Sequence, residues 1–151
     1  MRTRVRSWAK GLALPGLLCL LVTGLAVAAT PPVEKVEVST PAAPHQPRVT
    51  AEFSQLVHRE LRRVEVPPGR GERLILSAAL TQLDCLPEQD TIKTRASVSL
   101  TLREQRDGAI KALINGSASS IDAEEARDAA RHRAMEAAVR SALQRLPEAL
   151  E

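Results

Sequence analysis

Three runs of alternating apolar and polar residues dominate the chain, at positions 73–83, 92–103 and 109–120. A period of two places one apolar and one polar face on a β-strand. In the middle run the even positions carry Ile92, Ala96, Val98, Leu100 and Leu102, and the odd positions carry Lys93, Arg95, Ser97, Ser99, Thr101 and Arg103. The pattern predicts a small antiparallel sheet with one face in water.

The connection between the second and third runs sets their register. A two-residue turn at Asp107-Gly108 would place Leu100 opposite Asn115 and mix apolar with polar side chains. A three-residue loop at 106–108 keeps the apolar faces together, whereas a slip of one residue would turn every side chain over. This loop also suits a type I turn followed by a glycine in the left-handed region. We therefore predict that Leu102 pairs with Ala112, Leu100 with Ile114 and Ala96 with Ala118.

The first run joins the sheet on the same logic. Its apolar positions, Leu74, Leu76, Ala78 and Leu80, extend the apolar face toward Leu102, Leu100, Val98 and Ala96. The connection at 85–91 contains Pro87, and its length predicts an ordinary hairpin loop.

Apolar residues recur at helical spacing in one segment before the strands and in one after them. A helix capped at Thr50 and ending near Arg63 precedes them, with apolar positions at Phe53, Leu56, Val57 and Leu61. A second helix follows, from Asp122, with Glu125 completing a capping box, to about Leu146. Its first half is nearly all alanine and charge, and alanine lets a helix approach a sheet closely.

These elements predict an α+β fold, a two-layer sandwich in the order α-β-β-β-α with both helices on one face of an antiparallel sheet. We place this domain at residues 50–147, followed by a C-terminal tail at 148–151. The chain is long enough for one hydrophobic core and too short for two.

The N-terminus has the order of a secretory signal peptide, which we place at residues 1–28. Four basic residues precede an apolar run from position 11 to 29, and Ala26-Val27-Ala28 supplies the small residues of a cleavage site. No adjacent arginine pair marks the twin-arginine route, so we expect the general secretory pathway, a mature N-terminus near Ala29, and a periplasmic or secreted protein. The alternative is an uncleaved membrane anchor.

A Pro-rich linker is predicted at residues 29–49, because five prolines lie between positions 31 and 47 and favour an extended spacer. The alternative is a short edge strand built on Val33, Val36 and Val38.

Loss of the signal peptide changes the charge balance. It removes four of the 21 basic residues and none of the 18 acidic ones, which turns a net charge of +3 into about −1. This balance lacks the excess of positive charge that is typical of nucleic-acid-binding proteins. Arginine-rich, alanine-rich composition hints at a GC-rich bacterial genome.

Few residues offer catalytic chemistry. Cys85 with His132 or His58 is the one conceivable nucleophile–base pair, and we predict instead that Cys85 is a buried, inert thiol, with a disulfide to a second chain as the alternative. The sequence contains no metal-ligand spacing, phosphate-binding loop or paired carboxylates. We expect no cofactor and no enzymatic activity.

The polar face of the sheet is the candidate binding surface. It gathers small hydroxyl side chains with basic residues at one end, and the residues we assign to it are Arg73, Ser77, Ser97, Ser99, Thr101, Arg103, Lys111 and Ser117. In the chosen register Arg103 lies opposite Lys111, a like-charge pair that an anionic partner would relieve. The alternative is a solvated face without a partner.

The chain resembles a group of small bacterial envelope domains in the order of its segments. These are the helix FSQLVHREL at 53–61, the strands LILSAALTQL at 74–83, VSLTL at 98–102 and INGSA at 114–118, and the helix AAVRSAL at 137–143. The order is similar to domains of the curli-secretion-channel and penicillin-binding-protein-activator type, and to domains in secreted proteins of myxobacteria. The resemblance implies a non-enzymatic envelope module, although the lipoprotein cysteine of the envelope relatives is absent.

We therefore expect an exported module that docks a protein or polymer of the envelope. The alternatives are a small periplasmic hydrolase or thiol enzyme, and a structural domain that self-associates through an open sheet edge or Cys85.

Overall fold

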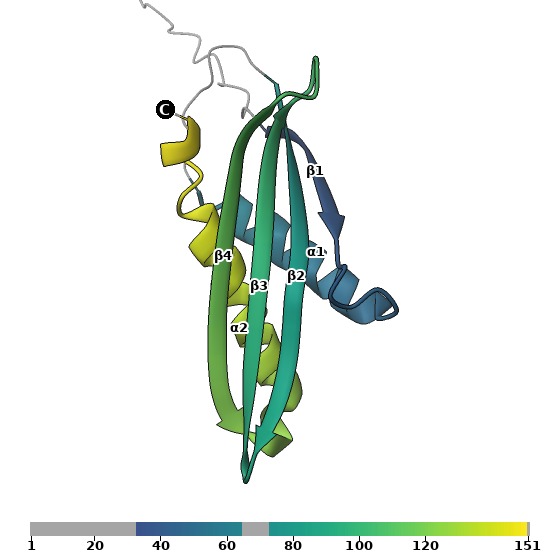
Figure 1. Cartoon of the computed structure of the whole chain (residues 1–151), viewed down its shortest axis with the longest axis vertical. Coiled ribbons are helices and arrows are strands. Elements are labelled where there is room, and N and C mark those ends of the chain that lie inside the picture. Colours follow the sequence, from purple (N-terminus) through teal and green to yellow (C-terminus); the bar gives the residue numbers. More distant parts are fainter. Residues whose placement is uncertain (1–32, 65–72, 151) are drawn as a thin grey trace, which may run out of the picture.

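The computed structural model describes residues 33–64 and 73–150, so the predicted signal peptide lies outside the described residues. The described elements form one sheet and two longer helices (Figure 1). Their bounds are β1 (Val33–Ser39), α1 (Pro47–Leu61), β2 (Leu74–Glu88), β3 (Thr91–Glu104), β4 (Ile110–Ala123), the 3-10 helix η1 (Glu124–Ala126), α2 (Arg127–Leu143) and the 3-10 helix η2 (Glu148–Leu150).

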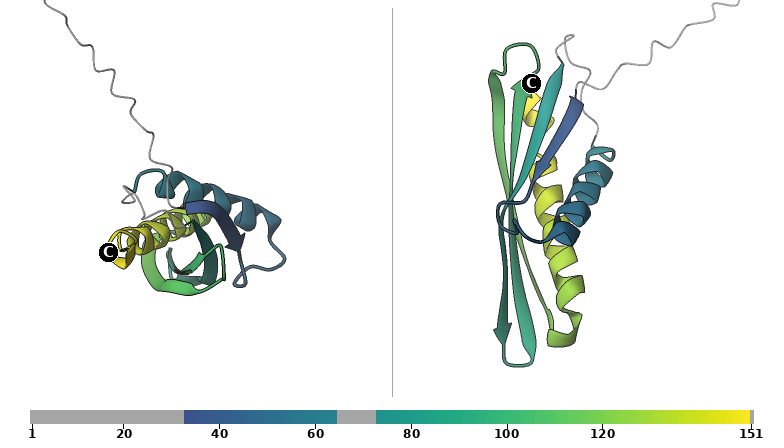
Figure 2. Two further views of the ribbon diagram at one scale, coloured as in Figure 1. Left: turned by 90° about the horizontal axis from the view of Figure 1, so that it is seen from above. Right: turned by 90° about the vertical axis from the view of Figure 1, so that its right-hand side faces the viewer.

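The molecule has two layers, as the sequence predicts. The strand order in the sheet is β1-β2-β3-β4, and both helices cover the same face of it (Figure 2). α2 packs on the sheet, while α1 lies beside α2 and over β1. The core between the layers includes Phe53, Leu56, Leu76, Leu80, Leu100, Leu102, Met135 and Leu143, all buried.

The predicted register of β3 and β4 is confirmed: Leu102 pairs with Ala112, Leu100 with Ile114 and Ala96 with Ala118. The loop is one residue longer than predicted, because Glu104 pairs with Ala109 and leaves residues 105–108 between them. The register shifts by one residue between Leu102 and Arg103, where Lys111 is the extra residue of β4. Gly108 has the expected positive φ, +74°.

β2 shares the apolar face of β3 as predicted, but a bulge interrupts it. Leu80 pairs with Val98 and Gln82 with Ser97, so Thr81 is the extra residue. Beyond the bulge, the odd-numbered residues of β2 share the inner face in place of the even-numbered ones. Leu83 and Cys85 thus pair with the inward-facing Ala96 and Thr94. β2 and β3 consequently continue to Glu88 and Thr91, and the predicted loop at 85–91 is wrong.

The N-terminal part of the domain differs most from expectation. Residues 33–39, predicted as part of an extended spacer, form the edge strand β1, which pairs parallel to β2. Val36 and Val38 are half-buried against the core, so burial of these valines explains the strand. α1 begins three residues before the predicted cap Thr50. Its first residue is Pro47, and proline is favourable in the first turn of a helix. The Thr50 hydroxyl instead bonds to the hydroxyl of Thr40, at 2.7 Å.

α2 begins five residues later than predicted, because β4 continues through Asp122. Asp122 does not cap the helix; its carboxylate accepts hydrogen bonds from Ser120 and Arg133. The close approach expected from the alanine-rich sequence is present at Gly116. A Cβ at this glycine would lie 2.4 Å from the carbonyl oxygen of Ala138 and 2.8 Å from the Cβ of Ala142.

Candidate binding face of the sheet

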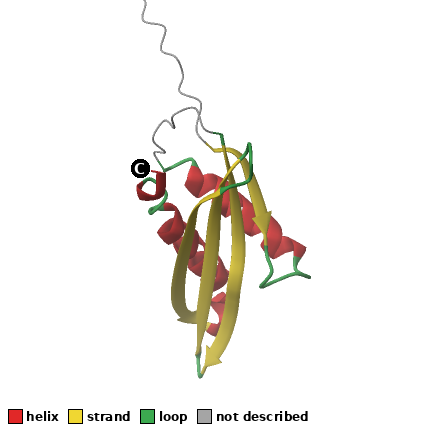
Figure 3. Cartoon of the chain, turned by 45° about the horizontal axis from the view of Figure 1, so that its top comes forward, coloured by secondary structure: helices red, strands yellow, loops and turns green. Residues whose placement is uncertain are grey.

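One face of the sheet carries the helices, and the other points away from them (Figure 3). The face that points away carries small polar side chains along its middle. We call it the outer face. Its rows follow the strand register: Ser77 lies opposite Thr101, Ser99 opposite Asn115, and Ser97 opposite Ser117. The structure thus brings together the hydroxyl residues that alternation predicts.

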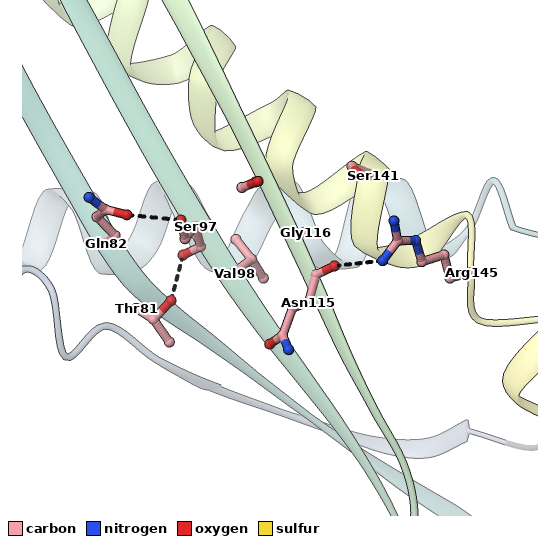
Figure 4. Close-up of a pocket in the computed structure, with 9 residues that line it drawn as sticks. Thr81, Gln82, Ser97, Val98, Asn115, Gly116, Ser141 and Arg145 are labelled. Carbon is pink, nitrogen blue, oxygen red and sulfur yellow. Dashed lines mark hydrogen bonds between the residues drawn. The ribbon is translucent and has the colours of Figure 1, made fainter.

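A shallow hollow of about 600 Å³ opens around the bulge of β2 (Figure 4). On the outer face it is lined by Thr81, Gln82, Ser97, Asn115 and Ser117, which we call the hydroxyl hollow. Arg145 and Ser141 reach the same depression from the end of α2, past the edge strand β4. A second shallow depression continues along the face to Arg95 and Ser119 and shares Gln82, Ser97 and Ser117 with the first.

Hydrogen bonds fix one side of the hydroxyl hollow. The Thr81 hydroxyl donates to the carbonyl of Ser97 at 3.1 Å, and the Ser97 hydroxyl donates to Oε1 of Gln82 at 3.1 Å. Nε2 of Gln82 donates to Asp84 at 2.5 Å. Within the described residues the side chains of Asn115 and Ser117 hold no hydrogen bond, so these donors and acceptors face solvent and are open to a ligand.

Sequence reasoning misses Gln82 and Asn115 as part of this surface. Gln82 stands at an even position, and strict alternation assigns it to the core. The extra residue at Thr81 turns it outward, and a bulge of this kind leaves no signal in a pattern of period two. Asn115 lies on the face that alternation predicts but is not among the residues assigned to binding.

The predicted cluster of unrelieved positive charge is wrong. Arg103 lies opposite Ile110 and not opposite Lys111, because the register shifts between them. Each basic residue also has a carboxylate partner: Arg103 bonds to Glu37, Lys111 Nζ lies 3.6 Å from Glu104, and Arg73 Nη1 lies 3.5 Å from Glu34. The acidic residues Glu34 and Glu37 come from β1, which the sequence predicts as part of a linker.

Glu37 is the central anion of this end of the face. Its carboxylate lies 2.9 Å from Lys35 Nζ, accepts the Ser77 hydroxyl at 3.2 Å and bonds to Arg103. The Lys35 hydrogen bond, with the Ser77 hydroxyl and the charges of Arg103 and Lys35, lowers the pKa of Glu37 despite its partial desolvation. Each of the three predicted cations thus has a carboxylate beside it, so an anionic ligand is not needed to relieve their repulsion.

Cys85, the candidate nucleophile, has no base beside it in the described part of the chain. Cys85 is half-buried at the end of the sheet, rather than buried as predicted, and its sulfur accepts the Thr94 hydroxyl at 3.7 Å. Nδ1 of His58 bonds to the carbonyl of Ser54, and Nδ1 of His132 lies 2.5 Å from Glu52. In the described part of the chain no three His, Cys, Asp or Glu side chains are grouped to hold a metal ion.

A group of closely spaced charges lies between the two helices, away from the outer face. Glu60 is 3% exposed and pairs with Arg63 at 2.7 Å, and with Arg59 and Arg140 at 3.3 Å each. Burial acts to raise the pKa of Glu60, but the hydrogen bonds from Arg140 and Arg59 and the charges of Arg63 and Arg140 outweigh it, so this pKa is lowered. These ion pairs join α1 to α2 and offer no unpaired charge for a ligand.

No protein-family model matches the chain, and the comparison with curated proteins finds no relative. Solved structures do match its fold. A minor lipoprotein from Acinetobacter baumannii has a TM-score of 0.52 at 12% identity, over 76% of this chain and 90% of that one. A PelC dodecamer from Paraburkholderia phytofirmans has a TM-score of 0.52 at 15% identity, over 76% of this chain and 86% of that one. The chain thus shares its α+β fold with these two bacterial proteins, one of which is a lipoprotein.

Among the described helices, none combines the length and the apolar character that crossing a membrane needs.

Proposed function

We propose that the protein is an exported, non-enzymatic module of the bacterial cell envelope that binds a protein or polymer through the hydroxyl hollow of its outer face. The observation that carries this proposal is the hollow itself. A β-bulge interrupts β2 where the side chains are small, and the depression is lined by hydroxyl and amide groups that both donate and accept hydrogen bonds.

The outer face suits a large partner better than a small molecule. Small-molecule sites are concave, mostly apolar and enclose their ligand. The hydroxyl hollow is open and polar, and the adjoining depression prolongs it along the strands toward Arg95 and Ser119. A partner with exposed polar groups along its length can therefore lie along the strands, over both depressions.

Two further observations support the envelope assignment. The N-terminal segment has the composition of a secretory signal peptide. The fold is also shared with a minor lipoprotein from Acinetobacter baumannii.

The proposal is tested by capture from an envelope extract with matched variants. Ser97 lies at the centre of the hollow, so Ser97→Arg fills it, while Gln55→Arg places the same side chain on the exposed surface of α1. Circular dichroism and thermal unfolding establish that both variants fold. We expect the wild-type protein and Gln55→Arg to retain the same envelope component and Ser97→Arg to lose it. Equal retention by all three proteins contradicts the proposal.

A further inference from the structure

The two edges of the sheet are built differently. β1 has seven residues, carries Glu34, Lys35 and Glu37, and has an irregular register between Val33 and Lys35. Short length, charge and irregularity are the devices that stop an edge strand from pairing with another chain. β4 is twice as long, and its residues 112–121 contain no charge and no proline. The β1 edge therefore carries these protective features, and residues 112–121 of β4 lack them.

Apolar side chains are exposed along the same edge strand. Of the four large hydrophobic residues exposed in the described part of the chain, three lie on β4: Ile110 at 69%, Leu113 at 64% and Ile121 at 64%. Leu113 and Ile121 point to the outer face and stand four residues on either side of Ser117. Residues 113–121 of the strand are therefore self-complementary about Ser117.

The backbone of β4 is oriented for this pairing. The amide of Glu124 donates to the carbonyl of Asp90, which places the even-numbered residues of β4 in hydrogen bonds with β3. Because these groups alternate along an antiparallel strand, the odd-numbered residues direct their N–H and C=O groups to the open edge. The carbonyl of Asn115 accepts a hydrogen bond from Nη1 of Arg145 at 3.4 Å, in agreement with this orientation. Arg145 must therefore release this carbonyl when a second strand pairs with the edge.

We propose that β4 pairs with β4 of a second copy in an antiparallel, two-fold symmetric dimer with Ser117 on the axis. In this register Leu113 of each copy lies opposite Ile121 of the other, and Asn115 lies opposite Ser119. A register shifted by two residues removes the apolar pairs. With the two-fold axis at Gly116, for example, Leu113 lies opposite Ser119. Dimerisation joins the two sheets into one and sets the two hydroxyl hollows side by side. The proposal goes beyond the proposed function and does not depend on it.

A charge swap tests both the interface and its register. Sedimentation velocity is measured over a concentration series on the protein purified from its host, with Leu113→Lys, with Ile121→Glu, and with the two variants mixed. Each single variant puts a charge opposite an apolar side chain, and self-association weakens by at least tenfold. The mixture restores a dimer, because a lysine at 113 then meets a glutamate at 121 across the axis. Leu86→Lys, on the outer face of β2 and 46% exposed, is the control and associates like the wild type.

Each remaining outcome contradicts the proposal. A wild-type protein that is monomeric over the whole series has no such interface. Single variants that associate like the wild type place the interface elsewhere, and single variants that fail without rescue in the mixture exclude this register. Neither Leu113 nor Ile121 lines the hydroxyl hollow, so capture of the envelope component by these variants separates a failed dimer from a failed binding site.

Discussion

At the scale of the residue, Gly116 determines how closely α2 approaches the sheet. The backbone of the helix occupies the space of the missing side chain, and neither the carbonyl of Ala138 nor the amide of Ala142 can move alone. We expect Gly116→Ala to lower the free energy of unfolding by about 3 kcal/mol, as overpacking of a tight contact does. Chemical denaturation measures the change. Ser117→Ala, one position along on the exposed face, is the control and changes it by less than about 0.5 kcal/mol.

Gly108 is required for its backbone conformation and not for space. Its φ is +74°, and a Cβ added at this position would have no atom within 4 Å. Gly108→Val should therefore cost about 1–2 kcal/mol of stability through backbone strain alone. Asp107→Ala loses one exposed hydrogen bond, from the Ala109 amide to Oδ1 of Asp107 at 2.9 Å, and should cost less. Equal effects of the two substitutions on the denaturation midpoint would show that the loop tolerates a side chain at 108.

At the scale of the element, buried Glu60 couples α1 to α2, and its titration should be visible in the stability of the whole domain. Because the folded pKa lies below that of the unfolded chain, the ion pairs contribute fully above about pH 4.5. Their contribution is lost as the pH falls through the folded pKa. Glu60→Gln should lower stability by about 2 kcal/mol at neutral pH, the usual cost of losing hydrogen bonds to a charged group.

The Glu60→Gln variant should also lose less stability than the wild type as the pH falls. Thermal unfolding between pH 7 and pH 3 compares the wild type, Glu60→Gln and the exposed Glu125→Gln, whose carboxyl forms no ion pair with the described residues. If Glu60→Gln loses stability with falling pH as steeply as the wild type, Glu60 is not the group that titrates.

At the scale of the whole molecule, the sequence predicts what depends on alternation and misses what depends on a single extra residue. The layer arrangement and the pairing of Leu100 with Ile114 follow from matched apolar faces. The bulge at Thr81 adds one residue to β2, and it alone turns Gln82 outward into the hollow. The sequence predicts a linker and offers β1 only as the alternative, because the surrounding prolines outweigh three valines locally. In the fold those valines gain burial against β2 and α1. Carboxylates of β1 then pair with Arg73 and Arg103, two of the charges that suggest an anionic partner.

The central claim is that the outer face, at the hydroxyl hollow, is the surface that meets a partner in the cell envelope. Site-specific photo-crosslinking in the native host tests it most directly, because the partner need not be known in advance. A photoreactive residue is placed at Ser97 in the hollow or at Gln55 on the exposed face of α1, and the cells are irradiated before the protein is recovered. We expect a discrete or high-mass adduct from position 97 and none from position 55. An adduct from position 55 alone would contradict the claim.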